Sequence, residues 1–137
     1  MIRVVLDTNT VISAIFWPKS TARRCLAGLA RRQYAIAVTR EVFDEYEAVA
    51  AELQPRFPAC SSAGALTWLR LKAAWLEPAP LGKPRSRDYK DDPFIACALA
   101  ARAKYLVTRD NDLLSMGKPF GIGMIAPDNF LALLREG

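Results

Sequence analysis

Short apolar runs alternate along the chain with longer stretches of helical period. Residues 2–6 form a β-branched run that Asp7 closes, and similar short runs follow at 34–38, 105–107 and 121–125. A continuous apolar run of this length is typical of a strand buried on both faces, and we assign the first one in that way. We therefore predict four strands and place Asp7 at the carboxyl end of the first.

The stretches between these strands predict helices. The first begins near Val11, the second follows a cap at Ser20 or Thr21, and the third follows Thr39. Asp92 and Pro93 predict a cap and a first helical residue. The first helix is expected to run from Val11, the second to end at about Arg32 and the third at about Leu53. The later helices are expected over 65–75, from 92 to about 103, over 111–116 as one or two turns, and over 127–135. Residues 54–62 predict a loop, and the Pro-rich basic stretch 77–90 a surface crossing.

Alternating strands and helices predict an α/β fold with a mainly parallel sheet and helices on both faces. The sequence has no internal repeat and no domain boundary, so we expect one domain over residues 1–137. Ligands of such folds lie beyond the carboxyl ends of the strands. Asp7 and the pair Asp110 and Asp112 fall at that end.

Composition limits the classes of protein to which this chain can belong and the chemistry that it can carry out. The chain has 137 residues, 52% of them hydrophobic, and its longest apolar run, 94–101, is too short to span a membrane. Asp7 interrupts the first run too early for a signal peptide, so we expect a cytoplasmic protein. The three cysteines form no C-x-x-C pair and predict no disulfide framework. A net charge of +5 suggests a polyanionic partner, although many soluble proteins are basic.

The sequence contains no histidine. This excludes a Ser-His-Asp triad, histidine acid–base cleavage of RNA and every zinc site that contains histidine. A hydrolase of this sequence needs another way to activate water.

Carboxylates are the remaining candidates. Val42, Tyr46, Val49 and Leu53 define the buried stripe of the third helix. Glu45 lies about 70° from the centre of that stripe at 100° per residue, whereas its acidic neighbours lie much farther round. We expect Glu45 to lean inward, and we assign the other acids to the solvated face: Glu41, Asp44 and Glu47.

The stretch Asp88-Tyr-Lys-Asp91-Asp92-Pro93 is a further source of acids. Asp92 is explained as a helix cap, but Asp91 is not. Singly, each acid of the chain is more often structural than catalytic, and the case rests on their convergence at one sheet edge. Crowded carboxylates bind protons or cations, and a set of oxygen donors favours Mg²⁺ or Mn²⁺ over zinc.

Four segments together resemble the motifs of the PIN-domain family. The first is Val4-Val5-Leu6-Asp7-Thr8-Asn9, and the second is the helix from Thr39 to Glu45. The third is Asp88-x-x-Asp91-Asp92-Pro-Phe-Ile, and the fourth covers residues 107–114, Val-Thr-Arg-Asp-Asn-Asp-Leu-Leu. The resemblance is closest to the VapC-like branch, the toxin components of toxin–antitoxin systems.

This resemblance implies a three-layer α/β/α fold, metal-dependent cleavage of RNA and frequent homodimerisation. It implies that Asp7, Glu45, Asp91 and Asp110 hold Mg²⁺ or Mn²⁺ and carry catalysis, with Asp112 as a further ligand. Asn9, Ser13 and Thr108 match polar positions that orient the acids or water, although local hydrogen bonding at turns and caps explains them nearly as well. The implied partner is a separate small antitoxin protein, and no association with a membrane is implied.

Several readings remain open at this stage. A phosphatase with Asp7 as nucleophile is disfavoured because position 9 is Asn rather than Asp. An inactive PIN-like scaffold or a protein-binding module is harder to exclude, although an acid stands at every position that the metal motif expects. Trp17, Trp68 and Trp75 are candidates for stacking on bases, but the last two lie in an apolar helical pattern that favours core packing or a dimer face. The basic residues available for phosphate contact are Arg23, Arg24, Arg31, Arg32, Lys83, Arg85, Arg87, Lys90 and Arg109.

Overall fold

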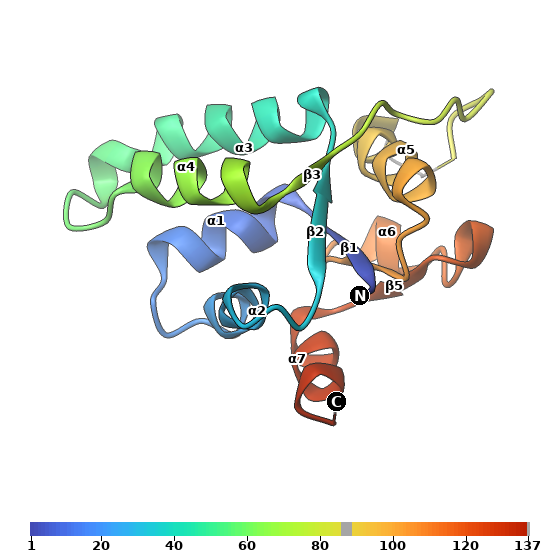
Figure 1. The fold of residues 1–137 in the computed structure, drawn as a ribbon. Helices are drawn as coiled ribbons and strands as arrows, with labels where there is room; N and C mark the ends of the chain where they lie inside the picture. Colours follow the sequence, from blue (N-terminus) through green and yellow to red (C-terminus); the bar gives the residue numbers. More distant parts are fainter. Residues whose placement is uncertain (86–88, 137) are drawn as a thin grey trace.

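Five parallel strands form the centre of the protein, in the order β3-β2-β1-β4-β5 (Figure 1). The computed structural model describes residues 1–85 and 89–136. Central strand β1 pairs with β2 and β4, and Val4, Val5 and Leu6 on it are almost completely buried. The strands are β1 (Arg3–Leu6), β2 (Ala35–Val38), β3 (Ala74–Trp75), β4 (Tyr105–Val107) and β5 (Gly123–Ile125).

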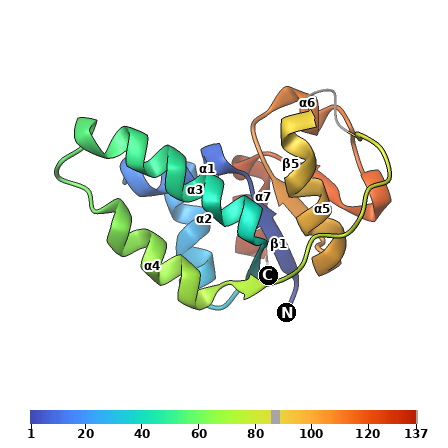
Figure 2. The ribbon, with the colours of Figure 1, turned by 90° about the horizontal axis from the view of Figure 1, so that it is seen from above.

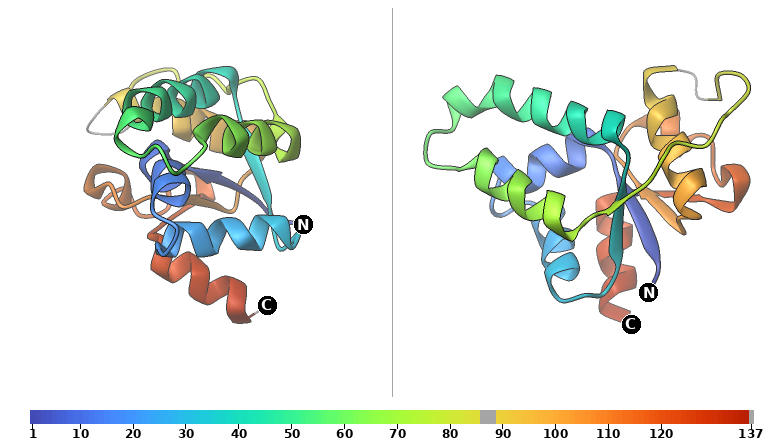
Figure 3. Two further views of the ribbon diagram at one scale, coloured as in Figure 1. Left: turned by 90° about the vertical axis from the view of Figure 1, so that its left-hand side faces the viewer. Right: turned by 45° about the horizontal axis from the view of Figure 1, so that its top comes forward.

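Helices cover both faces of this sheet. In the left view of Figure 3, α3, α4 and α5 lie above the strands, and α2 and α7 lie below them. Figure 2 shows α3 and α4 side by side, extending away from the strands. The predicted α/β class and parallel sheet are confirmed. The helices are α1 (Thr8–Phe16), α2 (Thr21–Ala30), α3 (Arg40–Leu53), α4 (Ser62–Lys72), α5 (Asp92–Ala101), α6 (Asn111–Leu114) and α7 (Pro127–Glu136), with 3-10 turns η1 (Gln54–Arg56), η2 (Tyr89–Asp91) and η3 (Pro119–Gly121).

Side-chain caps fix where the first helices begin. Ser20, one of the two predicted candidates, caps α2 by accepting the Arg23 N–H. Thr39 caps α3 in the same way. Helix α1 begins three residues earlier than the hydrophobic pattern predicts, because Asp7 caps it by accepting the Thr10 N–H at 2.9 Å.

The single helix predicted over 65–75 is wrong at both ends. Ser61 caps α4 by accepting the Gly64 N–H, and the extended backbone of Ala73 ends the helix at Lys72. Residues 74–75 then pair with β2 as the edge strand β3. A short apolar segment does not distinguish helix from strand, so only the pairing with β2 decides the assignment.

The predicted cap of α5 is also wrong. Asp92 is the first residue of the helix rather than its cap, and its carboxylate accepts the Arg85 backbone N–H at 3.1 Å. The physical reason is that η2 leads directly into α5, so Asp91 already has a helical backbone (φ −84°, ψ −13°) and makes no side-chain cap hydrogen bond. The helix ends at Ala101 because Arg102 is left-handed (φ 51°).

The tryptophans lie in three different settings. Trp68 is half-buried and packs against the core. Trp75 packs on Phe43 and on the Arg70 guanidinium. Trp17 ends α1 with 47% of its surface exposed. None of the helices within residues 1–85 and 89–136 is long and apolar enough to cross a membrane.

Candidate metal centre

Three carboxylates converge beyond the carboxyl end of β4. Oxygen atoms of Asp91, Asp110 and Asp112 all lie within 4.8 Å of one another, and all three residues are half-buried. Asp110 and Asp112 belong to the turn that follows β4, while Asp91 ends η2 at the start of α5. Asp110 caps α6 by accepting the Asp112 N–H at 2.8 Å, which fixes the orientation of its carboxylate.

Asp7 is joined to this group by one hydroxyl. The Thr108 O–H donates to Asp7 Oδ2, and Thr108 Oγ1 in turn accepts the Asp110 N–H at 2.9 Å. The backbone N–H of Asp7 donates to the Val107 carbonyl at 3.1 Å, so adjacent strands set the register of this contact. Thr108 is completely buried, and it is the predicted supporting residue that the structure places between two acids.

The carboxyl group of Asp7 is buried, since the residue is only 6% exposed. Desolvation raises the pKa of its carboxyl above the ordinary value. Hydrogen bonds from Thr10 and Thr108 act in the opposite direction, and the negative charge of Asp110 raises the pKa further. A cation placed among these acids would offset both the desolvation and the repulsion.

Glu45 stands beside Asp7 on a different element. Its carboxylate accepts the Thr8 O–H, and Thr8 follows Asp7 in the chain. The side chain is exposed, yet it is directed toward the end of β1, as its position near the buried stripe predicts. Asp44 and Glu41 are exposed as expected, and Glu47 pairs with Arg70 at 3.0 Å on the surface.

The structure therefore divides the predicted residues into a trio and two neighbours. Asp91, Asp110 and Asp112 form the trio, Asp7 adjoins it through Thr108, and Glu45 adjoins Asp7 through Thr8. Sequence reasoning missed Thr8 and Thr10. The available signal was their position immediately after a strand-ending acid, where hydroxyls commonly bond to neighbouring groups.

The other two predicted supporting residues have different surroundings. Asn9 is exposed. The backbone carbonyl of Ser13 accepts the Ser20 O–H at 3.1 Å, and Ser13 lines a hollow rather than the acid trio. Asp88, the first residue of the third motif, and Arg87 lie outside the described residues.

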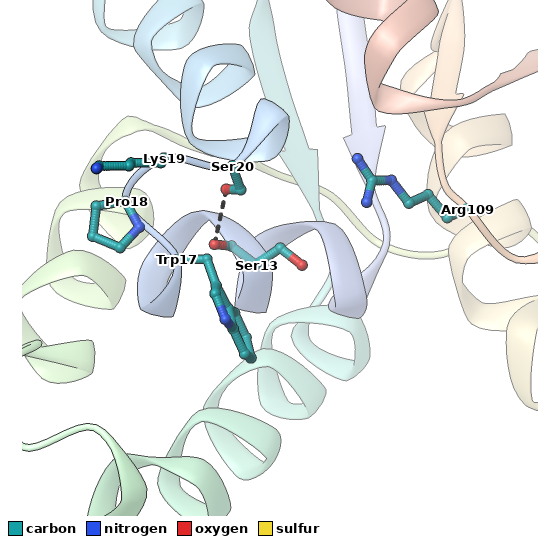
Figure 4. Close-up of a pocket in the computed structure, with 6 residues that line it drawn as sticks. All are labelled: Ser13, Trp17, Pro18, Lys19, Ser20 and Arg109. Carbon is teal, nitrogen blue, oxygen red and sulfur yellow. Dashed lines mark hydrogen bonds between the residues drawn. The ribbon is translucent and has the colours of Figure 1, made fainter.

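This hollow opens between the end of α1 and Arg109 (Figure 4). Its volume is about 660 Å³. Arg109 points toward the segment that holds Ser13 and Ser20, and its guanidinium pairs with Asp128 at 3.6 Å on the surface. The lining residues are Ser13, Trp17, Pro18, Lys19, Ser20 and Arg109.

A family model described as "PIN domain" matches residues 3–112. The chain belongs to the PIN domain family. The match runs from β1 to Asp112, so it includes all five acids of the site. PIN domains are generally nucleases that use divalent metal ions, and PIN nucleases act on RNA.

A solved structure agrees with this assignment at the level of the fold. The protein PAE2754 from Pyrobaculum aerophilum, known from a crystal structure, is similar to this PIN domain with a TM-score of 0.67 and 18% sequence identity. The similarity covers 99% of this chain and 91% of the other. No curated protein sequence matches this PIN domain.

Proposed function

We propose that this PIN domain is an endoribonuclease that depends on Mg²⁺ or Mn²⁺ and serves in the cytoplasm as the toxin of a toxin–antitoxin pair. The observation that carries the nuclease proposal is the convergence of Asp91, Asp110 and Asp112 within 4.8 Å. Half-buried carboxylates this close repel one another, and their oxygen atoms are the donors that hard divalent cations prefer. The donor set therefore fits such an ion.

Each acid has a distinct part in this proposal. The trio would hold the metal, with Asp7 and Glu45 completing its surroundings. When bound, Mg²⁺ or Mn²⁺ lowers the pKa of a water molecule and stabilises negative charge on the phosphate. Thr108 orients Asp7 and the Asp110 backbone, and Thr8 orients Glu45. Glu45 is exposed and accepts the Thr8 O–H, and in this proposal it would accept a proton from water.

Cleavage of a defined single-stranded RNA tests the nuclease proposal. We expect cleavage by the pure protein with Mn²⁺ and none with excess chelator. Asp110→Asn should lower the single-turnover rate and the Mn²⁺ affinity by about 100-fold or more, because even residues behind a metal ligand contribute about 10–100-fold. The matched control is Asp44→Asn, which removes an exposed acid of α3 and should change neither quantity.

Two results would contradict the proposal. The chain has no histidine that could replace the metal, so we expect no cleavage in excess chelator. Chelator-resistant cleavage by homogeneous protein would therefore contradict metal dependence. Binding of Mn²⁺ without cleavage of any RNA would favour the scaffold instead.

Loops should also be cut faster than matched hairpin stems, since unstacked strands can bend into a compact site.

The toxin assignment rests on the resemblance to the VapC-like branch. We expect a separate small protein to inhibit the enzyme by inserting a segment near the acids, and a homodimer to form. Overexpression of the active enzyme should arrest growth unless the inhibitor is supplied. Harmless overexpression of a demonstrably active enzyme would argue for a housekeeping nuclease.

A further inference from the structure

We infer that the hollow beside the acids is a nucleotide subsite, in which Trp17 stacks on an unpaired base of the RNA strand near the cleaved bond. This inference rests on the proposed nuclease function and specifies how its substrate is held. It is carried by the arrangement of Trp17, Lys19 and Arg109 around the hollow.

Trp17 is presented as a stacking platform. The residue is 47% exposed, although burying a large aromatic side chain is favourable. Its ring makes edge-on contacts with Phe57, with ring centroids 5.0 Å apart, and with Phe16 at 6.5 Å. A partly exposed aromatic ring that neighbouring rings hold through edge-on contacts loses little freedom when a base stacks on it, and such stacking tolerates any base sequence.

The segment around the ring is fixed before any ligand binds. Trp17 donates its backbone N–H to the Ser13 carbonyl at 3.0 Å, and the Ser20 N–H donates to the Trp17 carbonyl at 3.0 Å. The Ser20 hydroxyl adds a hydrogen bond to the Ser13 carbonyl, drawn in Figure 4. A wall held in this way avoids much of the ordering cost of binding.

Charge identifies the occupant as part of a polyanion. Lys19 and Arg109 stand at opposite ends of the hollow, with Arg109 directed toward it and the Lys19 side chain running outward, and the six lining residues include no acid. The surface pair between Arg109 and Asp128 is long, at 3.6 Å, and both side chains are well exposed, so a phosphate can compete for the guanidinium. An exposed apolar ring on a hollow that has a cation at each end matches a base with its flanking phosphates.

Position links the hollow to the acids. Arg109 directly precedes Asp110 of the trio, and Ser13 lies on the helix that Asp7 caps. Arg109 therefore borders the hollow and is joined through its peptide bond to an acid of the trio. Only an unpaired base offers a free face to Trp17, because duplex bases are already stacked.

The test measures RNA binding separately from cleavage. A fluorescein-labelled single-stranded oligoribonucleotide is titrated with protein in chelator, where no cleavage is expected, and anisotropy gives the affinity. Trp17→Ala should weaken binding by about 5- to 150-fold, since stacking contributes about 1–3 kcal/mol per base. Trp17→Phe should recover most of the affinity, whereas Trp17→Leu, which keeps apolar bulk against Phe57, should not. Trp75→Ala, at the far edge of the sheet, is the control and should bind like the parent.

Abasic substitutions in the oligonucleotide identify the stacked base. One abasic position should weaken binding to the parent and leave binding to Trp17→Leu unchanged, because partners in direct contact are not additive. Lys19→Ala should reduce the slope of log affinity against log salt by about 0.7, the value for one phosphate of a single strand.

The outcomes separate this inference from the proposed function. If the parent cleaves RNA but Trp17→Leu and Trp17→Ala bind like the parent, the subsite is rejected, the nuclease stands, and the hollow is left for a protein segment. If the parent binds RNA through Trp17 but never cleaves it, the nuclease is rejected and the subsite stands. If the parent binds no RNA, both are rejected.

Discussion

A single buried hydroxyl connects the two ends of the candidate site. Thr108 donates to Asp7 and accepts from the backbone of Asp110, so one side chain fixes the carboxylate that follows β1 against the turn that follows β4. A buried donor or acceptor that loses its partner costs about 1–3 kcal/mol. The position therefore serves stability and site geometry together.

Replacing Thr108 with Val tests this connection. Thr108→Val keeps the shape but leaves Asp7 Oδ2 without this donor and the Asp110 N–H without its acceptor. We expect a loss of about 1–3 kcal/mol in unfolding free energy and about 10–100-fold in Mn²⁺ affinity. Urea unfolding and calorimetric titration measure the two effects. Thr108→Ser is the control that should retain both, and parent-like Mn²⁺ affinity in Thr108→Val would show that the hydroxyl does not position the acids.

The pH dependence of stability reports the burial of Asp7. Because burial raises its folded pKa above the ordinary value of 3.8, the folded state binds more protons than the unfolded state between the two values. The contribution of Asp7 to stability is present below 3.8 and is lost as the pH rises through the folded pKa.

Asp7→Asn should therefore be more stable than the parent at pH 7 in chelator, since Asn still caps α1 but carries no buried charge. The gain should disappear as the pH falls below 3.8. Urea unfolding of both proteins over a pH series measures the difference, with Asp44→Asn as an exposed control. An Asp7→Asn protein that is no more stable than the parent at pH 7 would contradict the assigned burial effect.

At the scale of an element, two adjacent acids at the start of α5 have different roles. Asp91 reaches the trio, while the carboxylate of Asp92 holds the Arg85 backbone and so ties residues 81–85 to the helix. The sequence pattern predicted that Asp92 caps the helix and left Asp91 for the acid site, whereas in the structure Asp92 is the first helical residue. Because the backbone of Asp91 is already helical, its side chain does not cap α5.

Paired variants of these two acids should behave differently. Asp91→Asn should abolish Mn²⁺-dependent cleavage while keeping the fold, because it removes a charged ligand and little volume. Asp92→Ala should retain cleavage and lose about 0.5–1.5 kcal/mol, the usual contribution of one hydrogen bond. Single-turnover rates and thermal unfolding measure both. If Asp92→Ala inactivates a stable protein while Asp91→Asn stays active, the two residues have the opposite roles.

At the scale of the whole molecule, β5 and α7 extend the protein beyond the matched residues 3–112. Phe130 of α7 is completely buried, and its ring packs against Tyr34 at 5.0 Å and Tyr105 at 6.1 Å. The last helix thereby covers the face of the sheet opposite α5 and supports β4, the strand that leads to Asp110 (Figure 3). We infer that this extension stabilises the strand on which the site is built.

Truncating the Phe130 side chain tests the importance of that packing. Phe130→Ala should lower the unfolding free energy by about 3–5 kcal/mol, the usual range for a buried aromatic. Leu133→Ala on the same helix, where Leu133 is 39% exposed, should change it far less. Urea unfolding measures both variants. Similar small losses for the two would show that α7 packs only loosely against the sheet.

Much of the fold follows from local patterns. Strands β1, β2 and β4 are short, strongly apolar and closed by polar residues, so their assignment does not depend on distant contacts. Edge strand β3 could not be predicted, since residues 74–75 acquire strand character only by pairing with β2. The cap of α1 was also missed. The helix begins before the apolar residues of helical period, so the sequence pattern did not indicate Asp7 as its cap.

The sequence by itself determined the chemistry of the candidate site. It has acids after the predicted strands at 2–6 and 105–107, no histidine and no C-x-x-C pair, and these favour a metal centre of oxygen donors. Tertiary structure decided which acids meet. Asp91 joins Asp110 and Asp112, while Thr108 and Thr8 carry the connections to Asp7 and Glu45. The physical reason is range: strand and helix patterns act over a few residues, whereas Thr108 and Asp7 are 101 positions apart and meet only because β1 and β4 pair in register.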